Sequence, residues 1–306
     1  MDKSDDEASP QANAAGLTLA PYFADPDQLP APLPTEGEIV SSTDVLKTGF
    51  GRHIVRVGQH FVVKYGPGVS LTEGENMLFV REACGIPTPH VYALYTKTQP
   101  NGRKRAFIVM EYIDGEPLIS RWDTMSREAK SDMSRRMRSM LDKMRSIPSP
   151  GYYGCIGRRP LEDGMFWTSP NEDRSKLAID GPINGPFDTE QQLNRAMINK
   201  YLLIGTMPNK AKFYSRVVPR VLVNHVPVFT HGDLQGKNIL LRSDGSLVLI
   251  DWEAAGWYPS YWEYTLAMTA CGRWESDWHE FVADMLEEEY PTEYLWFEML
   301  LRELWS

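Results

Sequence analysis

The chain has 306 residues, of which 42% are hydrophobic and 24% charged, a composition typical of a folded globular protein that excludes global disorder. Its net charge of −9 argues against a nucleic-acid-binding surface, and it has no apolar stretch long enough to cross a membrane. The polar, acidic start MDKSDDEASP is unlike a secretory signal, and three widely spaced cysteines form no metal-ligand or disulfide pattern, so we predict a cytoplasmic protein.

Residues 1–35 are predicted to form a disordered tail. They are rich in small and acidic residues and contain six prolines between positions 10 and 34. Tyr22 and Phe23 are candidates for docking on a folded part of the chain, although nothing in the sequence requires it.

Residues 36–113 are predicted to form a small α+β lobe. The turn pairs Gly58–Gln59 and Asn101–Gly102 each separate two β-rich runs, which predicts two hairpins. Between the hairpins, apolar residues recur at helical spacing, with Ser70 as a cap and Gly85 at the end. The predicted elements are strands at 53–58 and 60–66, a helix at 70–85, and strands at 90–97 and 105–113.

Residues 114–306 are predicted to form a larger, mainly helical lobe. Methionines at helical spacing in 127–146 indicate a helix whose apolar stripe packs in the core. Further helices are expected in 189–217 and 261–304. The intervening segment 148–188 is rich in glycine and proline, which indicates a long ordered loop of the kind that carries substrate contacts.

The negative charge is concentrated at the end of the chain. Residues 272–306 contain ten acidic residues and two arginines, a local charge of −8. A solvated helix face is one interpretation. The other is an electrostatic lure for a cationic substrate.

The segment HGDLQGKNILLRSDGSLVLIDWE, residues 231–253, carries the most specific pattern. Its first residues form H-x-D-x-x-x-x-N with His231, Asp233 and Asn238. Two apolar runs joined by Asp244–Gly245 then predict a β-hairpin. The second run ends at Asp251, so the hairpin returns this acid to the loop.

Phosphoryl transfer from ATP explains these residue types. Mg²⁺ prefers oxygen ligands, which Asn238 and Asp251 offer, and a further carboxylate, Asp233, is needed to orient the acceptor hydroxyl and take its proton. The protein-kinase template uses the same loop pattern and a later metal-binding aspartate. We expect His231 to brace the loop through hydrogen bonds rather than to transfer protons.

Phosphates also need a cation, and Lys64 lies inside the apolar run FVVKYG. A buried, unpaired lysine is expensive, so a carboxylate partner is expected on the following helix; an edge-strand lysine is the alternative. The candidates are Glu73, Glu75 and Glu82. Glu73 shares a helix face with Met77, whereas Glu75 points about 200° away, so we predict Glu73 as the partner.

Nucleotide contacts are expected at two further places in the small lobe. Gly49 and Gly51 form a Gly-x-Gly turn that can bring backbone amides close to phosphate, although a plain turn fits equally well. Met110 is predicted at the back of the adenine pocket. The backbone groups predicted to pair with adenine belong to Glu111, Tyr112 and Ile113.

With these residues the chain resembles the aminoglycoside phosphotransferase family, a branch of the protein-kinase-like fold that includes choline kinases. HGDLQGKNIL followed by LIDWEAAGWYPSYWEY is most similar to fungal members, and the similarity extends over residues 45–306. It implies a bilobal α+β fold with an antiparallel sheet and one helix in the N-lobe and a mainly helical C-lobe. By matched position it implies Asp233 as base, Asn238 and Asp251 as Mg²⁺ ligands, and a phosphate-positioning pair of Lys64 and Glu73.

The chain departs from the protein-kinase pattern in ways that bear on function. Gln235 stands where protein kinases place lysine, and no full Gly-x-Gly-x-x-Gly loop is present. After Asp251 there is neither an Ala-Pro-Glu motif nor a long activation segment to bind a peptide. Tryptophans and tyrosines crowd this segment, where we expect core packing, with walling of the acceptor pocket as the alternative; Glu263 is a candidate brace for the loop.

We therefore predict an ATP- and Mg²⁺-dependent phosphotransferase acting on a hydroxyl of a small molecule, with a cationic acceptor as the alternative that the acidic segment suggests. No nucleic acid, membrane or obligate protein partner is expected. The alternatives are a protein Ser/Thr kinase, which would need a peptide platform, and a nucleotide-binding protein without catalytic activity.

Overall fold

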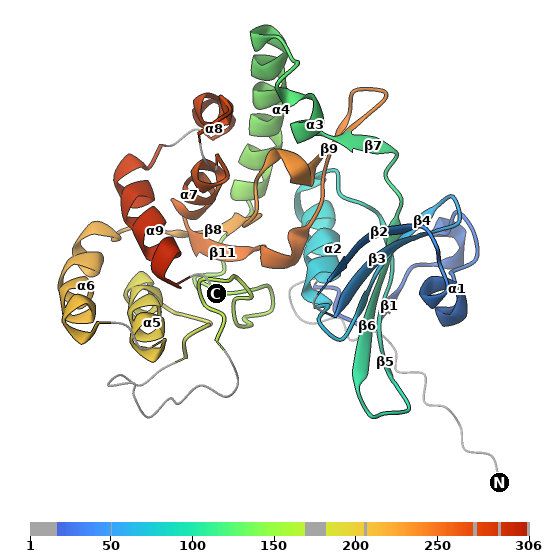
Figure 1. Ribbon diagram of the computed structural model, residues 1–306, viewed down its shortest axis with the longest axis horizontal. Helices are drawn as coiled ribbons and strands as arrows, with labels where there is room; N and C mark the ends of the chain where they lie inside the picture. The colour runs from blue at the N-terminus through green and yellow to red at the C-terminus, as the bar shows by residue number, and fades with distance from the viewer. Residues whose placement is uncertain are drawn as a thin grey trace. The chain divides into compact units, whose positions relative to one another are not determined.

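The computed structural model divides into two compact units, one up to Asp114 and one from Gly115 (Figure 1). The predicted lobe boundary after Ile113 lies one residue from this division. The first unit holds an antiparallel sheet and the second is mainly helical, which confirms the α+β class. The described residues are 17–49, 51–168, 182–204, 207–271, 274–286 and 289–304.

The first unit is built on a six-stranded antiparallel sheet in the order β1-β5-β6-β4-β3-β2. The four predicted strands are all present, and β1 and β2 extend the sheet at its two edges. The central strand β4 is buried along its whole length. The strands are β1 (Tyr22–Phe23), β2 (Val45–Gly49), β3 (Arg52–Val57), β4 (Phe61–Gly66), β5 (Val91–Thr98) and β6 (Lys104–Glu111).

Helix α2 (Thr72–Cys84) covers the sheet face that carries Lys64. Lys64 on β4 is the direct partner of Ile108 on β6, which is the partner of Leu94 on β5, so the three side chains point to one face. The helix lies very close there, because a Cβ on Gly74 would stand 2.1 Å from the Cδ2 atom of Leu94. As predicted, Gly85 ends the helix, in the left-handed conformation with φ 67°.

The prediction of a disordered tail over 1–35 is wrong for residues 17–35. This segment adds β1 to the sheet and continues through a 3-10 turn, η1 (Pro26–Gln28), to α1 (Glu36–Val40), which Thr35 caps. Its apolar side chains pack on the sheet face opposite α2, together with Ile39. Composition misled the prediction because these side chains stand singly between prolines and are buried only by a distant part of the chain. Residues 1–16 lie outside the described part.

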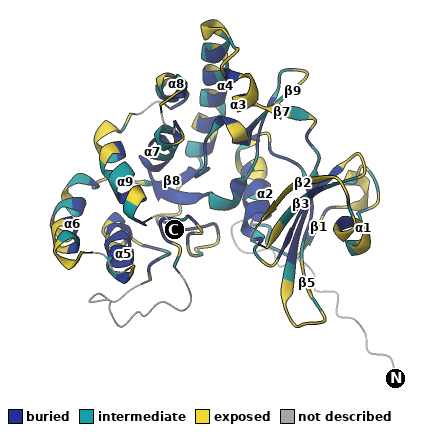
Figure 2. Ribbon diagram, in the orientation of Figure 1, coloured by how far each residue is buried: buried dark blue, intermediate teal, exposed yellow. Residues whose placement is uncertain are grey.

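The second unit packs seven described helices around short strands. The predicted helix at 127–146 is α4, whose Met137, Leu141 and Met144 are fully buried, which confirms the core stripe. Figure 2 shows an exposed and a buried side on both α4 and α6. The helices are α3 (Leu118–Trp122), α4 (Arg127–Arg145), α5 (Glu190–Leu203), α6 (Pro208–Val221), α7 (Trp262–Thr269), α8 (Trp278–Met285) and α9 (Pro291–Leu304).

Five strands connect these helices in two small sheets. β10, β9 and β7 form one sheet, and β11 pairs with β8 in the other. Within the described ranges, no helix combines the length and the apolar character that a membrane crossing needs. The strands are β7 (Gly115–Pro117), β8 (Pro227–Thr230), β9 (Ile239–Arg242), β10 (Leu247–Leu249) and β11 (Gly256–Pro259).

The described part of the predicted 148–188 loop is held by backbone pairs. Tyr153 pairs with Phe187, and Gly154 pairs with Trp257 of β11. The loop is therefore anchored to the strand that follows the predicted metal-binding acid. Residues 169–181 of this prediction lie outside the described residues.

A buried lysine joins α4 to the start of α8. Lys130 donates to both carboxylate oxygens of Asp277, at 2.8 and 2.7 Å, and the indole of Trp122 donates to Oδ1 at 2.8 Å. The Lys130 side chain is only 9% exposed. Removing the carboxylate would leave a buried charge and a buried N–H without their partner.

We expect Asp277→Ala to lower the free energy of unfolding by about 2–3 kcal/mol, measured by urea denaturation. Glu280→Ala is the matched control, because Glu280 forms an exposed ion pair with Arg127 in the same region. That variant should lose less than about 1 kcal/mol. Equal losses in the two variants would contradict the assigned role of burial.

Candidate functional site

The predicted loop from His231 to Asn238 joins β8 to β9 in the second unit. Gly232 has a φ of 82°, and a Cβ at this position would lie 2.6 Å from the carbonyl oxygen of Ala254. Glycine is required there both by the backbone conformation and by the close approach of the chain after Asp251. The loop ends in a 3-10 turn, η3 (Gly236–Asn238).

The carboxylate of Asp233 is held by residues of its own loop. The Nδ2 atom of Asn238 donates to Asp233 Oδ2 at 2.7 Å and to the Asp233 carbonyl at 2.9 Å. Gln235 Nε2 donates to Oδ1, and Lys237 Nζ lies 3.4 Å from Oδ2. Lys237 was not among the predicted site residues, because no helical or strand pattern in this loop indicates which side chain would turn toward Asp233.

The predicted hairpin is present and brings Asn238 and Asp251 to the same end. β9 and β10 pair with Ile239 opposite Leu249, and Ile250 N–H donates to the Asn238 carbonyl at 3.0 Å. Asp251 follows directly in the left-handed conformation, with φ 64°, and opens the 3-10 turn η4 (Trp252–Ala254). The chain therefore reverses sharply at this acid.

The Asn238 and Asp251 side chains fit a hard divalent cation. Because Asn238 Nδ2 is engaged with Asp233, its Oδ1 is the amide atom that remains to bind a metal. Together with the Asp251 carboxylate it makes an all-oxygen donor set, which suits Mg²⁺.

His231 braces the loop in the way its sequence position suggested. Its Nδ1 accepts the Asp233 N–H at 3.2 Å, so the proton is on Nε2, which donates to the Ile250 carbonyl at 3.0 Å. The ring packs edge-on against Trp252, with centroids 4.5 Å apart. One ring nitrogen thus braces the loop internally, and the other joins the loop to the hairpin.

Glu263, the predicted brace at the start of α7, accepts hydrogen bonds from the backbone of the same loop. Its Oε2 accepts the His231 N–H at 2.6 Å and its Oε1 accepts the Gly232 N–H at 3.3 Å. Burial raises the pKa of this carboxyl, while His231 and the two N–H groups oppose the rise. The brace is therefore a buried acid tied to two backbone amides.

A pocket of about 660 Å³ in the second unit contains Asp233. Its polar lining carries four acidic residues and two basic ones, and α7 and α9 supply apolar side chains. The charged lining residues are Glu162, Asp163, Asp233, Glu253, Lys237 and Arg302.

Asp163 in this pocket was missed by the sequence analysis. It is 2% exposed, and its Oδ1 accepts the Met165 N–H at 2.7 Å. Burial raises its pKa to about 6; the Met165 N–H, the Trp262 indole and Lys200 oppose the rise, and the charge of Asp233 adds to it. An acid in a Gly/Pro-rich loop gives no local signal of burial, so only the fold reveals it.

The aromatic residues after Asp251 pack in the core, as predicted. Trp252, Tyr258 and Trp262 are fully buried, and none of them lines the Asp233 pocket. Their alternative role as walls of an acceptor pocket is therefore not supported.

The described acids of the C-terminal segment lie away from the lining of the Asp233 pocket. Five of them pair with basic side chains, of which Arg302 lines the pocket: Asp277 with Lys130, Glu280 with Arg127, Glu293 with His225, Glu298 with Arg302, and Glu303 with Lys210. The acidity of the pocket comes from other parts of the chain.

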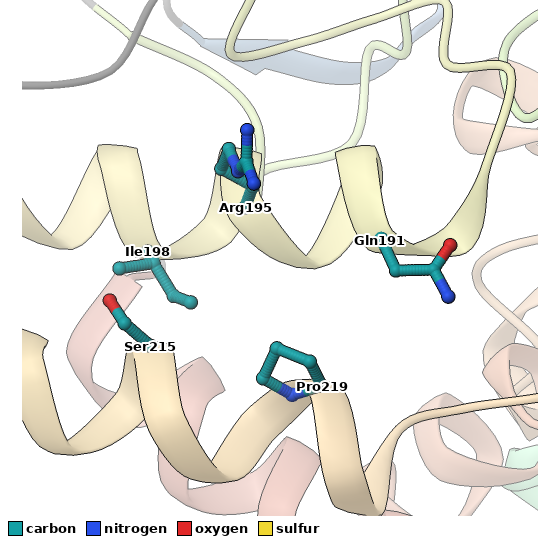
Figure 3. Close-up of a pocket in the computed structure, with 5 residues that line it drawn as sticks. All are labelled: Gln191, Arg195, Ile198, Ser215 and Pro219. Atoms are coloured by element: carbon teal, nitrogen blue, oxygen red, sulfur yellow. The ribbon is translucent and has the colours of Figure 1, made fainter.

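A second pocket, of about 440 Å³, lies between α5 and α6 (Figure 3). Figure 3 shows Ile198 facing α6 and Pro219 facing α5. Its five lining residues include none of the predicted site residues: Gln191, Arg195, Ile198, Ser215 and Pro219. The pocket with Asp233 is therefore the candidate site of the second unit.

In the first unit, Lys64 and Glu73 form the predicted ion pair. Nζ lies 2.5 Å from Oε2, and the two side chains are 5% and 4% exposed. Lys64 lies on a central strand, which excludes the edge-strand interpretation. Glu75 contacts another part of the chain, since its Oε1 accepts the Ala20 N–H at 2.9 Å.

The two glycines of the predicted phosphate loop lie at the β2–β3 turn. Gly49 pairs with Arg52, and Gly51 has a φ of 74°. The Gly51 carbonyl packs so closely on Gly66 that a Cβ on Gly66 would lie 1.9 Å from it. These contacts explain the glycines as turn residues; their contact with phosphate stays a prediction, and Phe50 between them lies outside the described residues.

The segment predicted to bind adenine follows β6. Met110 is buried and pairs with Val62. The N–H of Glu111 donates to the His90 carbonyl and that of Tyr112 to the His60 carbonyl. Among the described residues no such bond engages the N–H of Ile113, and the contact of this segment with adenine stays a prediction.

Comparison with known proteins finds related sequences. The sequence model of the phosphotransferase enzyme family (APH) matches residues 57–300. A subtelomeric hrmA-associated cluster protein of Aspergillus fumigatus is 29% identical over 145 residues, which are 40% of this chain and 28% of that protein. Altered inheritance of mitochondria protein 9 of Komagataella phaffii is 28% identical over 123 residues, 39% of this chain and 18% of that protein. The chain thus matches less than a third of the length of these relatives.

Solved structures share the fold at low sequence identity. The GDP complex of aminoglycoside 2'-phosphotransferase-IIIa matches with a TM-score of 0.52 and 14% identity, covering 85% of this chain and 80% of that one. Choline kinase LicA from Streptococcus pneumoniae matches with a TM-score of 0.50 and 13% identity, over 87% and 84%. Aminoglycoside phosphotransferase APH(4)-Ia matches with 0.50 and 14%, over 88% and 81%. These matches confirm the predicted kinase-like fold.

The raised pKa of Asp163 predicts that the stability of the folded protein depends on pH. Its carboxyl titrates near 3.8 when unfolded and at about 6 in the fold, so the folded state holds the extra proton between these values and its stability falls as the pH rises through them. Asp163→Asn keeps an acceptor for Met165 N–H but does not titrate.

We expect the variant to gain about 2 kcal/mol over the wild type between pH 4 and pH 7, measured by urea denaturation at a series of pH values. The titration of Glu263 occurs in both proteins and cancels in this difference. A difference that does not change with pH would contradict the assignment.

Proposed function

Because the chain belongs to the phosphotransferase enzyme family, we propose that it transfers the γ-phosphate of ATP to a hydroxyl group of a small molecule. The observation that carries the proposal is the Asp233 carboxylate, fixed by Asn238 and Gln235 at the wall of a 660 Å³ pocket. A carboxylate held in this way can orient a hydroxyl and accept its proton as the oxygen attacks phosphorus.

The other predicted site residues would bind the phosphates, the base and the metal ion. The Lys64 ammonium, held by Glu73, would bind phosphate oxygens of ATP, and the Ile113 N–H would bind the base. Asn238 Oδ1 and the Asp251 carboxylate would hold Mg²⁺, which when bound neutralises charge on the phosphates. Lys237, close to Asp233, adds a cation at the acceptor side.

The charge of the pocket supports a cationic acceptor. Four carboxyl groups and two cations line it, and the charge of Asp233 contributes to the raised pKa of Asp163. An ammonium group on the acceptor would reduce the repulsion between these acids. We therefore propose a small hydroxylated amine as substrate class.

A protein substrate is less well supported. From Asp251 the chain passes directly through η4 and β11 into α7, and all of these residues are described. β11 is fully buried. This segment offers no extended shelf on which a peptide could lie, in contrast to the activation segment of protein kinases.

We expect Asp233→Asn to lower kcat by about 10³-fold while binding of ATP with Mg²⁺ changes less than about threefold. Asp244→Asn, in the exposed turn of the same hairpin, is the matched control and should keep full activity. Turnover is measured as the ATP-dependent mass gain of acceptors in a metabolite extract. A peptide array tests phosphorylation of peptides in parallel. Undiminished turnover in Asp233→Asn would show that the mechanism is wrong, and phosphorylation of peptides alone would favour a protein kinase.

For any acceptor that this screen identifies, we expect KM to rise with ionic strength more steeply than KM for ATP. Salt screens the attraction between a cationic acceptor and the acidic pocket lining. Initial rates between about 0.05 and 0.5 M salt measure both constants. An equal rise in the two constants would contradict a cationic acceptor.

A further inference from the structure

Residues 17–24 lie against the helix that carries Glu73, and we call them the N-terminal strap. Tyr22 and Phe23 form β1 on the edge strand β5, with Tyr22 opposite Leu94. A hydrogen bond holds the strap on each side of β1. Before it, Ala20 N–H donates to Glu75 Oε1 at 2.9 Å, and after it, Ala24 N–H donates to the Tyr92 carbonyl at 2.9 Å.

These contacts lie beside Glu73 on α2. Glu73 reaches Lys64 on the sheet, Gly74 packs on Leu94, and Glu75 binds the strap. Residues two apart on a helix point about 200° from each other. The helix is therefore held from two directions at the turn that presents Glu73.

The strap contact is buried and charged. Glu75 is 3% exposed, as is Glu73, so its carboxylate depends on partners inside the protein. Hydrogen bonds to a buried carboxylate are among the stronger ones, and their loss leaves the charge poorly solvated. A helix that must bury both acids has its rotation about its own axis fixed.

We propose that the N-terminal strap is a positioning element for phosphoryl transfer: by holding Glu75 it keeps α2 in the rotation that places Glu73 on Lys64. Glu75 is thus a positioning residue that acts through Glu73. The consequence for turnover rests on the proposed function, whereas the effect on α2 does not.

Both partners of the contact can be changed within the full chain. Glu75→Ala removes the acceptor and Ala20→Pro removes the donor N–H. Each should lower kcat/KM for ATP about tenfold with the acceptor KM within about twofold, because only the phosphate-binding lysine is affected. Glu75→Gln keeps an acceptor oxygen and should restore most of the loss, and Glu82→Ala, at an exposed site on α2, should have no effect.

The double variant tests whether the two changes act through one contact. If they do, Ala20→Pro with Glu75→Ala loses no more than either change alone. Multiplied losses would overturn the proposal, as would a loss in Glu75→Gln equal to that in Glu75→Ala.

Hydrogen exchange of the α2 amides provides a readout that needs no acceptor. In Glu75→Ala these amides should exchange about tenfold faster than in the wild type, while those of α4 stay unchanged. Equal exchange of α2 in the two proteins would overturn the proposal whatever the turnover. A wild type without turnover on any acceptor would instead count against the proposed function alone.

Discussion

One backbone hydrogen bond organises the second unit, the bond from Ile250 N–H to the Asn238 carbonyl. It closes the β9–β10 hairpin at the point where the loop ends and Asp251 begins. The carbonyl of the same Ile250 accepts from His231, so this single residue ties the start of the loop, its end and the returning strand together. The backbone positions of the two candidate metal ligands, Asn238 and Asp251, thus follow from the register of a short hairpin.

Buried charges shape both units, and each is satisfied differently. Lys64 has an opposite charge within a central sheet. Glu263 accepts from two backbone amides and Asp163 from one, while the Trp262 indole also stabilises the Asp163 carboxylate, and burial raises the pKa of both acids. Burial of such groups costs stability unless they are paired. Buried titratable groups of this kind are common at functional sites, where they reduce stability but provide chemically useful side chains.

The sequence predicted those features whose determinants are close together in the chain. The H-x-D-x-x-x-x-N loop, the hairpin with its Asp244–Gly245 turn and the choice of Glu73 over Glu75 all depend on spacing within about twenty residues, which local geometry constrains. The structure contains each of these arrangements. The chemical roles assigned to the site residues remain predictions.

What the sequence did not predict depends on distant parts of the chain. Residues 17–35 are ordered because an edge strand and a sheet face, both formed far along the chain, receive their side chains. Asp163 is buried because its loop is anchored to β11 through Gly154 and Trp257. The acidic C-terminal segment suggested a lure because composition shows where charges lie in sequence, whereas ion pairing decides which of them act at a distance.

Gly74 sets the spacing between α2 and the sheet. With no side chain at this position, the helix axis comes so near to β5 that a short carboxylate arm is enough to reach the ammonium on β4. Alanine would add a single methyl group where a Leu94 methyl now lies, so either the Leu94 side chain or the helix would have to move. The space that this glycine leaves therefore helps a glutamate, the longest acidic side chain among the standard amino acids, to reach Lys64.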